Sequence, residues 1–253
     1  PRFSYPSLFP IPSIAPLSHL HNATYIWHPP GGVSLCGAVR YKDGTKDIYM
    51  PSLVFILGRE PHLSVAEIAA VVEDAEWGKA ELSSEALLVP ANVGEGFMPS
   101  RDRMGGNESR PYAHALMDRL GGTIKIGGTV IEMTNDQFPM SNTTDVIGNV
   151  IFECTNADKK VHFGFSVYDL GGGRKRVEEV RRALTRGAAA QKAWLKEHGR
   201  TVRWVTSREP TLSSVIVKNE KLTPEQNGVE VLVLVGANHI TIARTLAVQP
   251  FEE

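Results

Sequence analysis

Cysteine is scarce in this sequence: Cys36 and Cys154 are the only two among 253 residues. They lie far apart and form no Cys-x-x-Cys pair, so they supply too few thiolates for a structural zinc site. Free thiols in a reducing compartment are the plain interpretation, and we therefore expect a cytoplasmic protein. No apolar run approaches the roughly 20 residues that a membrane-spanning helix needs.

Recognisable catalytic motifs are also absent. The sequence contains no Gly-x-Ser-x-Gly, no Walker loop and no His-Glu-x-x-His. Its eight histidines are scattered, and none lies at ligand spacing from a carboxylate or a cysteine. Gly94-Glu-Gly96 lacks the third glycine and the strand-to-helix context of a dinucleotide-binding loop. We therefore assign no catalytic or metal-binding residue, and a stand-alone enzyme with an unrecognised site is the less favoured alternative.

The net charge is only −1 at neutral pH, which does not suggest a bulk polyelectrolyte binder, but the charges are segregated. Residues 159–208 contain 13 Lys or Arg and 4 Asp or Glu, a net of +9, so the rest of the chain carries −10. Such an asymmetry within one chain points to a local anionic partner.

The first 49 residues differ from everything that follows. Seven of the 16 prolines lie in the first 30 residues, where Arg2 is the only Lys, Arg, Asp or Glu. Prolines at positions 6, 10, 12 and 16 interrupt any hydrophobic region of a signal peptide. We interpret residues 1–49 as a proline-rich extended arm that is dispensable, and we expect the foldable unit to begin near Met50.

The chain is organised around a strand, a turn and a helix between residues 53 and 73. Residues 53–57 form a short unbroken apolar run, typical of a buried strand, and Gly58 ends it. Ser64-Val-Ala-Glu67 matches the capping box, which predicts a helix that starts at Ser64. The apolar face of this helix is predicted to contain Val65, Ile68, Ala69 and Val72.

The remaining elements are predicted from apolar periodicity and from turn residues. Up to residue 154 they are a strand at 86–90, a loop at 91–111, a helix at 112–120, a strand at 123–126, a connection at 136–145 and an apolar run at 146–152. From residue 155 they are a half-buried strand at 161–168, helices at 177–185 and 188–198, and strands at 201–205, 212–222, 229–235 and 242–248. This order is typical of an α+β protein.

Several strings resemble a single family. The pattern from Phe55 to Ile68, Phe-Ile-Leu-Gly-Arg-x-Pro-x-Leu-Ser-x-Ala-Glu-Ile, is similar to the amino-terminal domain of the tRNA guanosine-N2 methyltransferases that carry a THUMP domain. Val161-His-Phe-Gly, Leu212-Ser-Ser-Val-Ile-Val-Lys-Asn and Ala243-Arg-Thr-Leu-Ala-Val-Gln-Pro-Phe-Glu resemble the bacterial relatives of that family. The resemblance implies a ferredoxin-like amino-terminal domain at residues 50–154, followed by a THUMP-like α/β domain at residues 155–253.

The resemblance also implies a function. A methyltransferase of this family needs a glycine-rich loop for S-adenosylmethionine and an Asp/Asn-Pro-Pro-aromatic motif, and the sequence has neither. The match ends at Phe251-Glu252-Glu253, about where the catalytic domain of the family begins. We therefore expect no cofactor in this chain. S-adenosylmethionine is expected only in a methyltransferase domain outside it, in cis or in trans, to which this chain presents structured RNA, in particular the acceptor end of tRNA.

The basic half supplies the candidate RNA contacts. Gly171-Gly-Gly-Arg-Lys-Arg176 either brings backbone amides and three cations to a phosphate or is a solvated loop. Trp194 and Trp204 are interpreted as core residues rather than as platforms for bases. A protein-interaction module whose basic face meets an acidic partner is the rival interpretation. The candidate RNA-binding residues are Lys160, His162, Arg174, Lys175, Arg176, Arg181, Arg182, Lys192, Lys196, Arg200, Arg203, Lys218 and Lys221.

Overall fold

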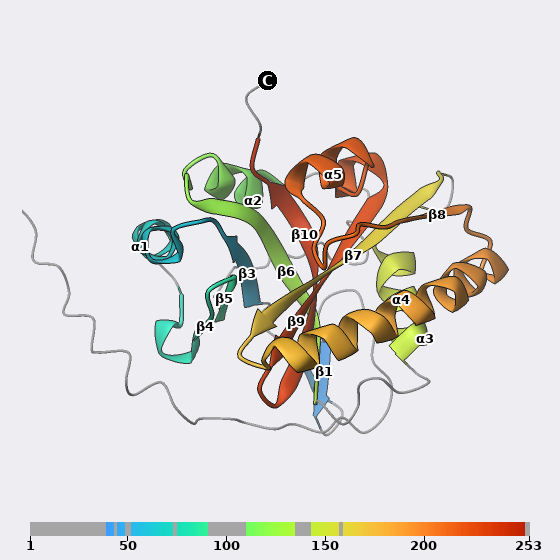
Figure 1. Ribbon diagram of the computed structural model, residues 1–253, viewed down its shortest axis with the longest axis horizontal. Helices are drawn as coiled ribbons and strands as arrows, with labels where there is room; N and C mark the ends of the chain where they lie inside the picture. Colours follow the sequence, from blue (N-terminus) through green and yellow to red (C-terminus); the bar gives the residue numbers. More distant parts are fainter. Residues whose placement is uncertain are drawn as a thin grey trace, which may run out of the picture. The chain divides into compact units, whose positions relative to one another are not determined.

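The computed structural model describes residues 39–42, 45–48, 52–72, 75–90, 110–134, 143–156 and 159–250 (Figure 1). Its helices are α1 (Pro61–Val71), α2 (Arg110–Met117), α3 (Thr143–Glu153), α4 (Arg174–Glu197) and α5 (Ser214–Asn219), with short 3-10 turns η2 (Trp77–Lys79) and η6 (Pro224–Gln226). Its strands are β1 (Val39–Lys42), β2 (Thr45–Ile48), β3 (Ser52–Leu57), β4 (Glu81–Leu82), β5 (Ala86–Pro90), β6 (Thr123–Thr134), β7 (Val161–Leu170), β8 (Val202–Val205), β9 (Gly228–Gly236) and β10 (His239–Val248). The α+β class is therefore as predicted. Among the described residues, no helix is both long and apolar enough to cross a membrane.

Three of the predicted segments fall partly outside the described residues. The predicted arm is described only in its last part, where β1 and β2 pair as an antiparallel hairpin. The predicted loop at 91–111 is described only from residue 110. The predicted connection at 136–145 is described only from residue 143, and the apolar run after it lies in α3. For the rest of these segments the sequence-based interpretation stays a prediction.

Eight of the described strands form one mixed sheet in the order β4-β5-β3-β6-β10-β9-β7-β8. Neighbours from β4 to β9 are antiparallel, whereas β7 is parallel to both β9 and β8. Because β6 pairs with β10, strands from both sides of residue 154 belong to the same sheet. The domain boundary near residue 154 stays a prediction.

Helices α1 to α4 supply the side chains that cover one face of this sheet. Ile68 of α1 and Leu116 of α2 pack with Phe55 of β3 and Ile126 of β6. Toward the other end of the sheet, α3 and α4 pack together over β9, β7 and β8 (Figure 1). Burial of these apolar faces, at roughly 25 cal/mol per Å², is the main force that holds the helices on the sheet.

The sheet curls toward its opposite face. Tyr168 of β7 shares an apolar cluster with Val54 of β3 and Leu88 of β5, although three strands separate β7 from β3 in the pairing order. The backbone amide of Asp169 also donates a hydrogen bond of 3.0 Å to the Glu85 carboxylate, just before β5. The curled face therefore encloses an interior between distant strands.

Helix α1 starts earlier than the capping box predicts. Pro61 is its first residue, and no side chain caps it. Instead, the Ser64 hydroxyl donates to the Gly122 carbonyl oxygen at 2.6 Å, and the Glu67 carboxylate accepts from the Gly122 amide at 2.7 Å. The capping-box prediction is wrong because both side chains bind the turn before β6. Of the predicted apolar face, Ile68 and Val72 are buried, Val65 is half-buried and Ala69 is exposed.

Strand β6 is much longer than the predicted segment at 123–126 and passes through two glycines. A Cβ atom at Gly127 would lie 2.6 Å from a methyl carbon of Leu232, and one at Gly128 would lie 3.1 Å from a methyl carbon of Leu246. The neighbouring leucines therefore use the space that side chains at these positions would need. Glycine marks a close approach here rather than the end of the strand.

Helix α4 is one helix of 24 residues, so the prediction of two helices is wrong. Its buried stripe runs without a break across Gly187: Val180, Leu184, Ala188, Gln191 and Leu195. A glycine inside a helix costs about 1 kcal/mol relative to alanine, which this continuous burial offsets. The predicted end is confirmed, because Gly199 follows the helix with a φ of +78°.

Two further predictions differ from the structure. Residues 212–222 contain helix α5 rather than a strand, because Ser213 caps its start by accepting from the Ile216 amide at 3.3 Å. Strand β7 was predicted to be half-buried, yet Ser166 and Tyr168 on its second face are also buried. These two residues face the interior of the curled sheet, where polar partners are available.

Candidate nucleic-acid interface

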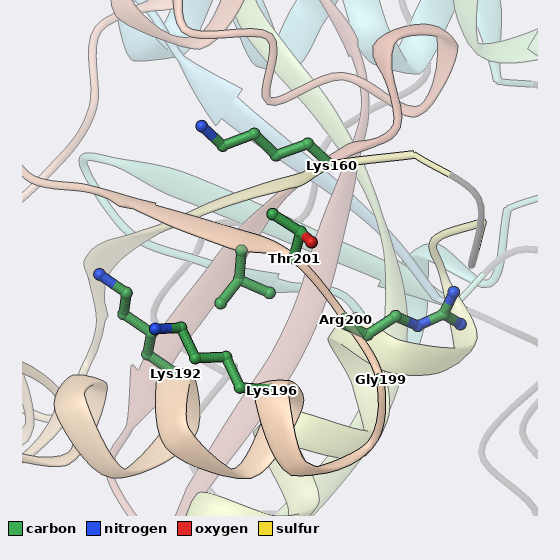
Figure 2. Close-up of a pocket in the computed structure, with 7 residues that line it drawn as sticks. Lys160, Lys192, Lys196, Gly199, Arg200 and Thr201 are labelled. Atoms are coloured by element: carbon green, nitrogen blue, oxygen red, sulfur yellow. The ribbon is translucent and has the colours of Figure 1, made fainter.

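Three lysines from two parts of the chain line one open depression of about 450 Å³. Lys192 and Lys196 lie one turn apart near the end of α4, and Lys160 immediately precedes β7 (Figure 2). Their side chains extend to the same side in this view, and Gly199, Arg200, Thr201 and Val202 complete the lining. We call this feature the lysine depression.

The lysine depression has no internal counter-charge among the described residues. Lys160 and Lys196 are exposed and Lys192 is half-buried, and none of the three forms an ion pair with a described carboxylate. The end of a helix carries a partial negative charge, so cations in its last turns are tolerated there. The arrangement therefore offers ammonium groups to an external anion.

The backbone amides of the glycine string at the start of α4, unlike the lysines of the depression, already have partners within the chain. The amides of Gly171 and Gly173 donate to one carboxylate oxygen of Asp169 at 2.9 and 3.0 Å, and the Gly172 amide donates to the Val235 carbonyl oxygen at 3.0 Å. All three glycine amides are occupied, so the hypothesis that they cradle a phosphate is wrong. Arg174 and Lys175 are exposed beside them, whereas Arg176 lies 3.5 Å from the Glu179 carboxylate.

Two arginines in the middle of α4 share one carboxylate. Arg182 Nε lies 2.9 Å from Glu178, and Arg181 Nη1 lies 3.5 Å from it. Arg181 also donates to the Arg208 carbonyl oxygen at 2.7 Å. The hydrogen bond from Arg182 is the main cause that lowers the pKa of Glu178. This group therefore carries one net positive charge rather than two.

Arg200 is only 7% exposed and serves the protein interior. Its Nη2 donates to the carbonyl oxygens of Phe152 and Thr155, both at 3.1 Å, and its guanidinium lies 4.2 Å from the centre of the Phe152 ring. Figure 2 shows its side chain pointing away from the three lysines. We therefore leave Arg200 out of the surface that we propose below, although the sequence made it a candidate.

The other candidates lie near α5. Arg203 forms an ion pair of 2.7 Å with Glu220, and His162 Nδ1 lies 2.8 Å from the Glu220 carbonyl oxygen. Because a carbonyl oxygen only accepts, Nδ1 of His162 is the nitrogen that carries the proton. Lys218 and Lys221 are exposed and form no ion pair with a described carboxylate. None of these four residues lines the lysine depression.

A buried polar network was not predicted from the sequence. The Lys125 ammonium group donates to Glu230, to the Tyr168 hydroxyl and to the Leu212 carbonyl oxygen. Glu230 also accepts from Ser166 and from a threonine of β10, so each charge is matched. The available signal was a lone charged residue inside each of two apolar runs, Thr-Ile-Lys-Ile and Val-Glu-Val-Leu-Val. The network is fully buried and offers no surface to a ligand.

The described residues contain no group of three or more His, Cys, Asp or Glu that could hold a metal ion. Trp194 and Trp204 are half-buried and pack against the core beneath α4, which agrees with their interpretation as core residues. Trp194 also stacks on His198, with ring centres 3.9 Å apart. The candidate surface therefore consists of cations, without a metal site in the described ranges.

No protein-family model matches this chain, and no curated protein matches it. Several solved structures resemble it, and TrmN and PH1313 are two of them. TrmN from Thermus thermophilus is 12% identical with a TM-score of 0.38, and the match covers 79% of this chain and 46% of TrmN. PH1313 from Pyrococcus horikoshii Ot3 is 8% identical with a TM-score of 0.40, and the match covers 77% of this chain and 54% of PH1313. The chain spans about half the length of each, and this distant structural similarity assigns no role to any of its residues.

Proposed function

We propose that this chain is an RNA-binding module, with ferredoxin-like and THUMP-like parts, that holds tRNA for an S-adenosylmethionine-dependent methyltransferase domain. The observation that carries the proposal is the lysine depression, which three lysines line without an ion pair to a described carboxylate. RNA phosphates are the anions that such a surface binds through release of condensed counterions. The sequence strings that resemble the THUMP-containing tRNA methyltransferases favour RNA over other polyanions as the ligand.

The test is a salt titration of tRNA binding with matched variants. Changing Lys160, Lys192 and Lys196 to Gln removes the depression's charge, so affinity falls and the slope of log K against log salt flattens by about 2 to 3, at roughly 0.7–0.9 per lost phosphate contact. The control changes two exposed cations at the other end of the sheet that form no ion pair with a described carboxylate, Arg59 and Arg119, to Gln. Equal losses of affinity per removed charge in the two variants would leave only non-specific charge and would contradict the proposal.

A second triple variant, in which Arg174, Lys175 and Arg176 become Ala, tests the start of α4. Because the glycine amides there are occupied and Arg176 is close to Glu179, this variant loses less affinity than the lysine variant. Binding is measured by filter retention or anisotropy at several salt concentrations. A larger loss in the arginine variant would place the main contact at the start of α4 instead.

Two measurements separate this function from its rivals. A tRNA that lacks its single-stranded acceptor end binds more weakly than intact tRNA if the module is THUMP-like, and equally well if only charge matters. An acidic protein partner would give salt dependence without that difference. Calorimetric titration with S-adenosylmethionine is expected to show no binding, and micromolar binding would favour the stand-alone enzyme.

A further inference from the structure

Helix α4 presents a row of cations along one exposed face. Arg174 and Lys192 are 18 positions apart, which is five full turns at 3.6 residues per turn, so both lie on the same side of the helix. Lys196, Arg181 and Arg182 fall within about a quarter turn of that line. We call these five residues the α4 row: Arg174, Arg181, Arg182, Lys192 and Lys196.

The row has a defined length. From Arg174 to Lys196 is 22 positions, or about 33 Å at 1.5 Å per residue. Unpaired charge is concentrated at its two ends, because the Glu178 carboxylate offsets part of the charge of the two central arginines. The lysine depression is one end of the row, and Lys160 adds a further cation there.

The surroundings of the row favour a duplex over a single strand. Sites for single strands combine cations with aromatic side chains on which bases stack. The other residues on this face are Glu178, Thr185 and Ala189, and none is aromatic. Trp194 lies on a different side of the helix, where it packs edge-on against Phe152 of α3. The row therefore offers contacts to phosphates without a platform for bases.

We propose, on the basis of the RNA-binding function above, that α4 lies along double-stranded RNA and that the two ends of its row contact phosphates about one duplex turn apart. A span of about 33 Å corresponds to about 12 base pairs at the roughly 2.8 Å rise per pair of an A-form RNA duplex. A shorter duplex reaches only one end of the row. It binds at the lysine depression, which three lysines line, and makes no contact with Arg174.

The experiment measures binding to RNA hairpins that share one loop and have stems of 5, 8, 11, 14 and 17 base pairs. Affinity and salt slope rise with stem length and level off at about 12 base pairs. Arg174→Gln weakens binding of the 17-pair hairpin about two- to fivefold, the range of one exposed ion pair, and does not change binding of the 5-pair hairpin. Arg186→Gln is the matched control, because Arg186 is an exposed cation of α4 that lies about a third of a turn from the line through Arg174 and Lys192.

Three outcomes would overturn the proposal: affinity that levels off at five pairs, an equal effect of Arg174→Gln on short and long hairpins, or equal losses from Arg174→Gln and Arg186→Gln. A single strand with as many phosphates that binds as tightly as the longest hairpin would also overturn it. RNA binding with any of these results leaves the proposed function standing, whereas failure to bind any of the RNAs removes both. Circular dichroism of each variant confirms that α4 is intact.

Discussion

Lys125 and Lys196 carry the same side chain in opposite surroundings. Lys125 is 1% exposed inside the curled sheet, and its ammonium group contacts Glu230, Tyr168 and the Leu212 carbonyl oxygen. Lys196 is exposed at the end of α4 and has no ion pair with a described carboxylate. An unmatched charge is strongly unfavourable in the interior but nearly neutral in water. A cation that pairs with a buried carboxylate therefore has a structural role, whereas an exposed cation without such a partner is available to a ligand.

The largest effect is expected from breaking the buried pair. Glu230→Gln leaves the Lys125 ammonium group buried without a counter-charge, which lowers the free energy of unfolding by about 3–5 kcal/mol. Adding Lys125→Met to this variant removes the unmatched charge and recovers part of the loss. Urea unfolding at pH 7 measures both. A loss below about 1 kcal/mol in the single variant would contradict the burial of this pair.

The next effect concerns Arg200, which the sequence grouped with the RNA-binding cations. Arg200→Lys keeps the charge but cannot bond both carbonyl oxygens and stack on Phe152, so stability falls by about 1.5–3 kcal/mol. The matched control is Arg182→Lys at an exposed position, with little expected change. RNA affinity of the folded Arg200 variant stays unchanged. A loss of RNA affinity without a loss of stability would return Arg200 to the RNA-binding set.

These examples show what the sequence could predict. Local patterns were sufficient where one element buries one face: the strand at 86–90 has the predicted bounds, and the predicted apolar positions of α2, such as Leu116, are buried. Local patterns failed where a contact with residues distant in the sequence determines the structure. Ser64 binds Gly122 rather than its own helix, and Gly187 does not interrupt α4 because the buried stripe continues beneath it.

The features of the candidate site also divide into those that local sequence predicts and those that depend on the tertiary fold. Clustering of Lys and Arg in the basic half indicates candidate side chains, but it does not show which of them are buried or paired with a carboxylate. The carboxylates that pair with Arg182 and Arg203 come from one turn away and from a different element, respectively. Only the second of these pairings depends on the tertiary fold. The position of Lys160 in the same depression as the end of α4 also depends on the tertiary fold, because 32 positions separate Lys160 from Lys192.

A smaller effect is expected from Tyr168, whose hydroxyl accepts from Lys125 at 3.3 Å. Tyr168→Phe lowers stability at pH 7 by about 0.5–1.5 kcal/mol through the lost hydrogen bond. Burial, reinforced by the Glu230 charge, raises the pKa of Tyr168 well above its ordinary value of 10.0. The phenol therefore stays protonated in the folded protein after it ionises in the unfolded chain.

The raised pKa of Tyr168 determines the direction in which its contribution to stability changes at alkaline pH. The contribution of the Tyr168 phenol is complete below pH 10 and is lost as pH rises above it, by about 1.4 kcal/mol per pH unit. The stability difference between wild type and Tyr168→Phe therefore narrows from pH 10 to pH 11. Urea unfolding at pH 8, 9, 10 and 11 measures it. A difference that stays constant over this range would mean that the phenol is not buried.

The smallest effect is expected on the α4 row, where the contrast between paired and unpaired cations can be tested directly. Glu178→Gln removes the carboxylate shared by Arg181 and Arg182, so these arginines become available to phosphate. RNA affinity is expected to rise about two- to fivefold, and the salt slope steepens by about 0.9 for one added contact. Glu179→Gln, one position along the helix, is the control, since its carboxylate pairs with Arg176 outside the row.

The stability of Glu178→Gln changes little, because the ion pairs are exposed, and its pH dependence follows from the pKa of Glu178. The hydrogen bond from Arg182 lowers that pKa, so the ion pairs contribute above the ordinary value of 4.5 and their contribution is lost as pH falls through the lowered value. Thermal unfolding of both proteins from pH 7 to pH 3 should therefore show a small difference that disappears in acid. If Glu178→Gln binds RNA no more tightly than wild type, pairing with a carboxylate does not limit these arginines. The contrast between matched and unmatched cations would then not explain where RNA binds on α4.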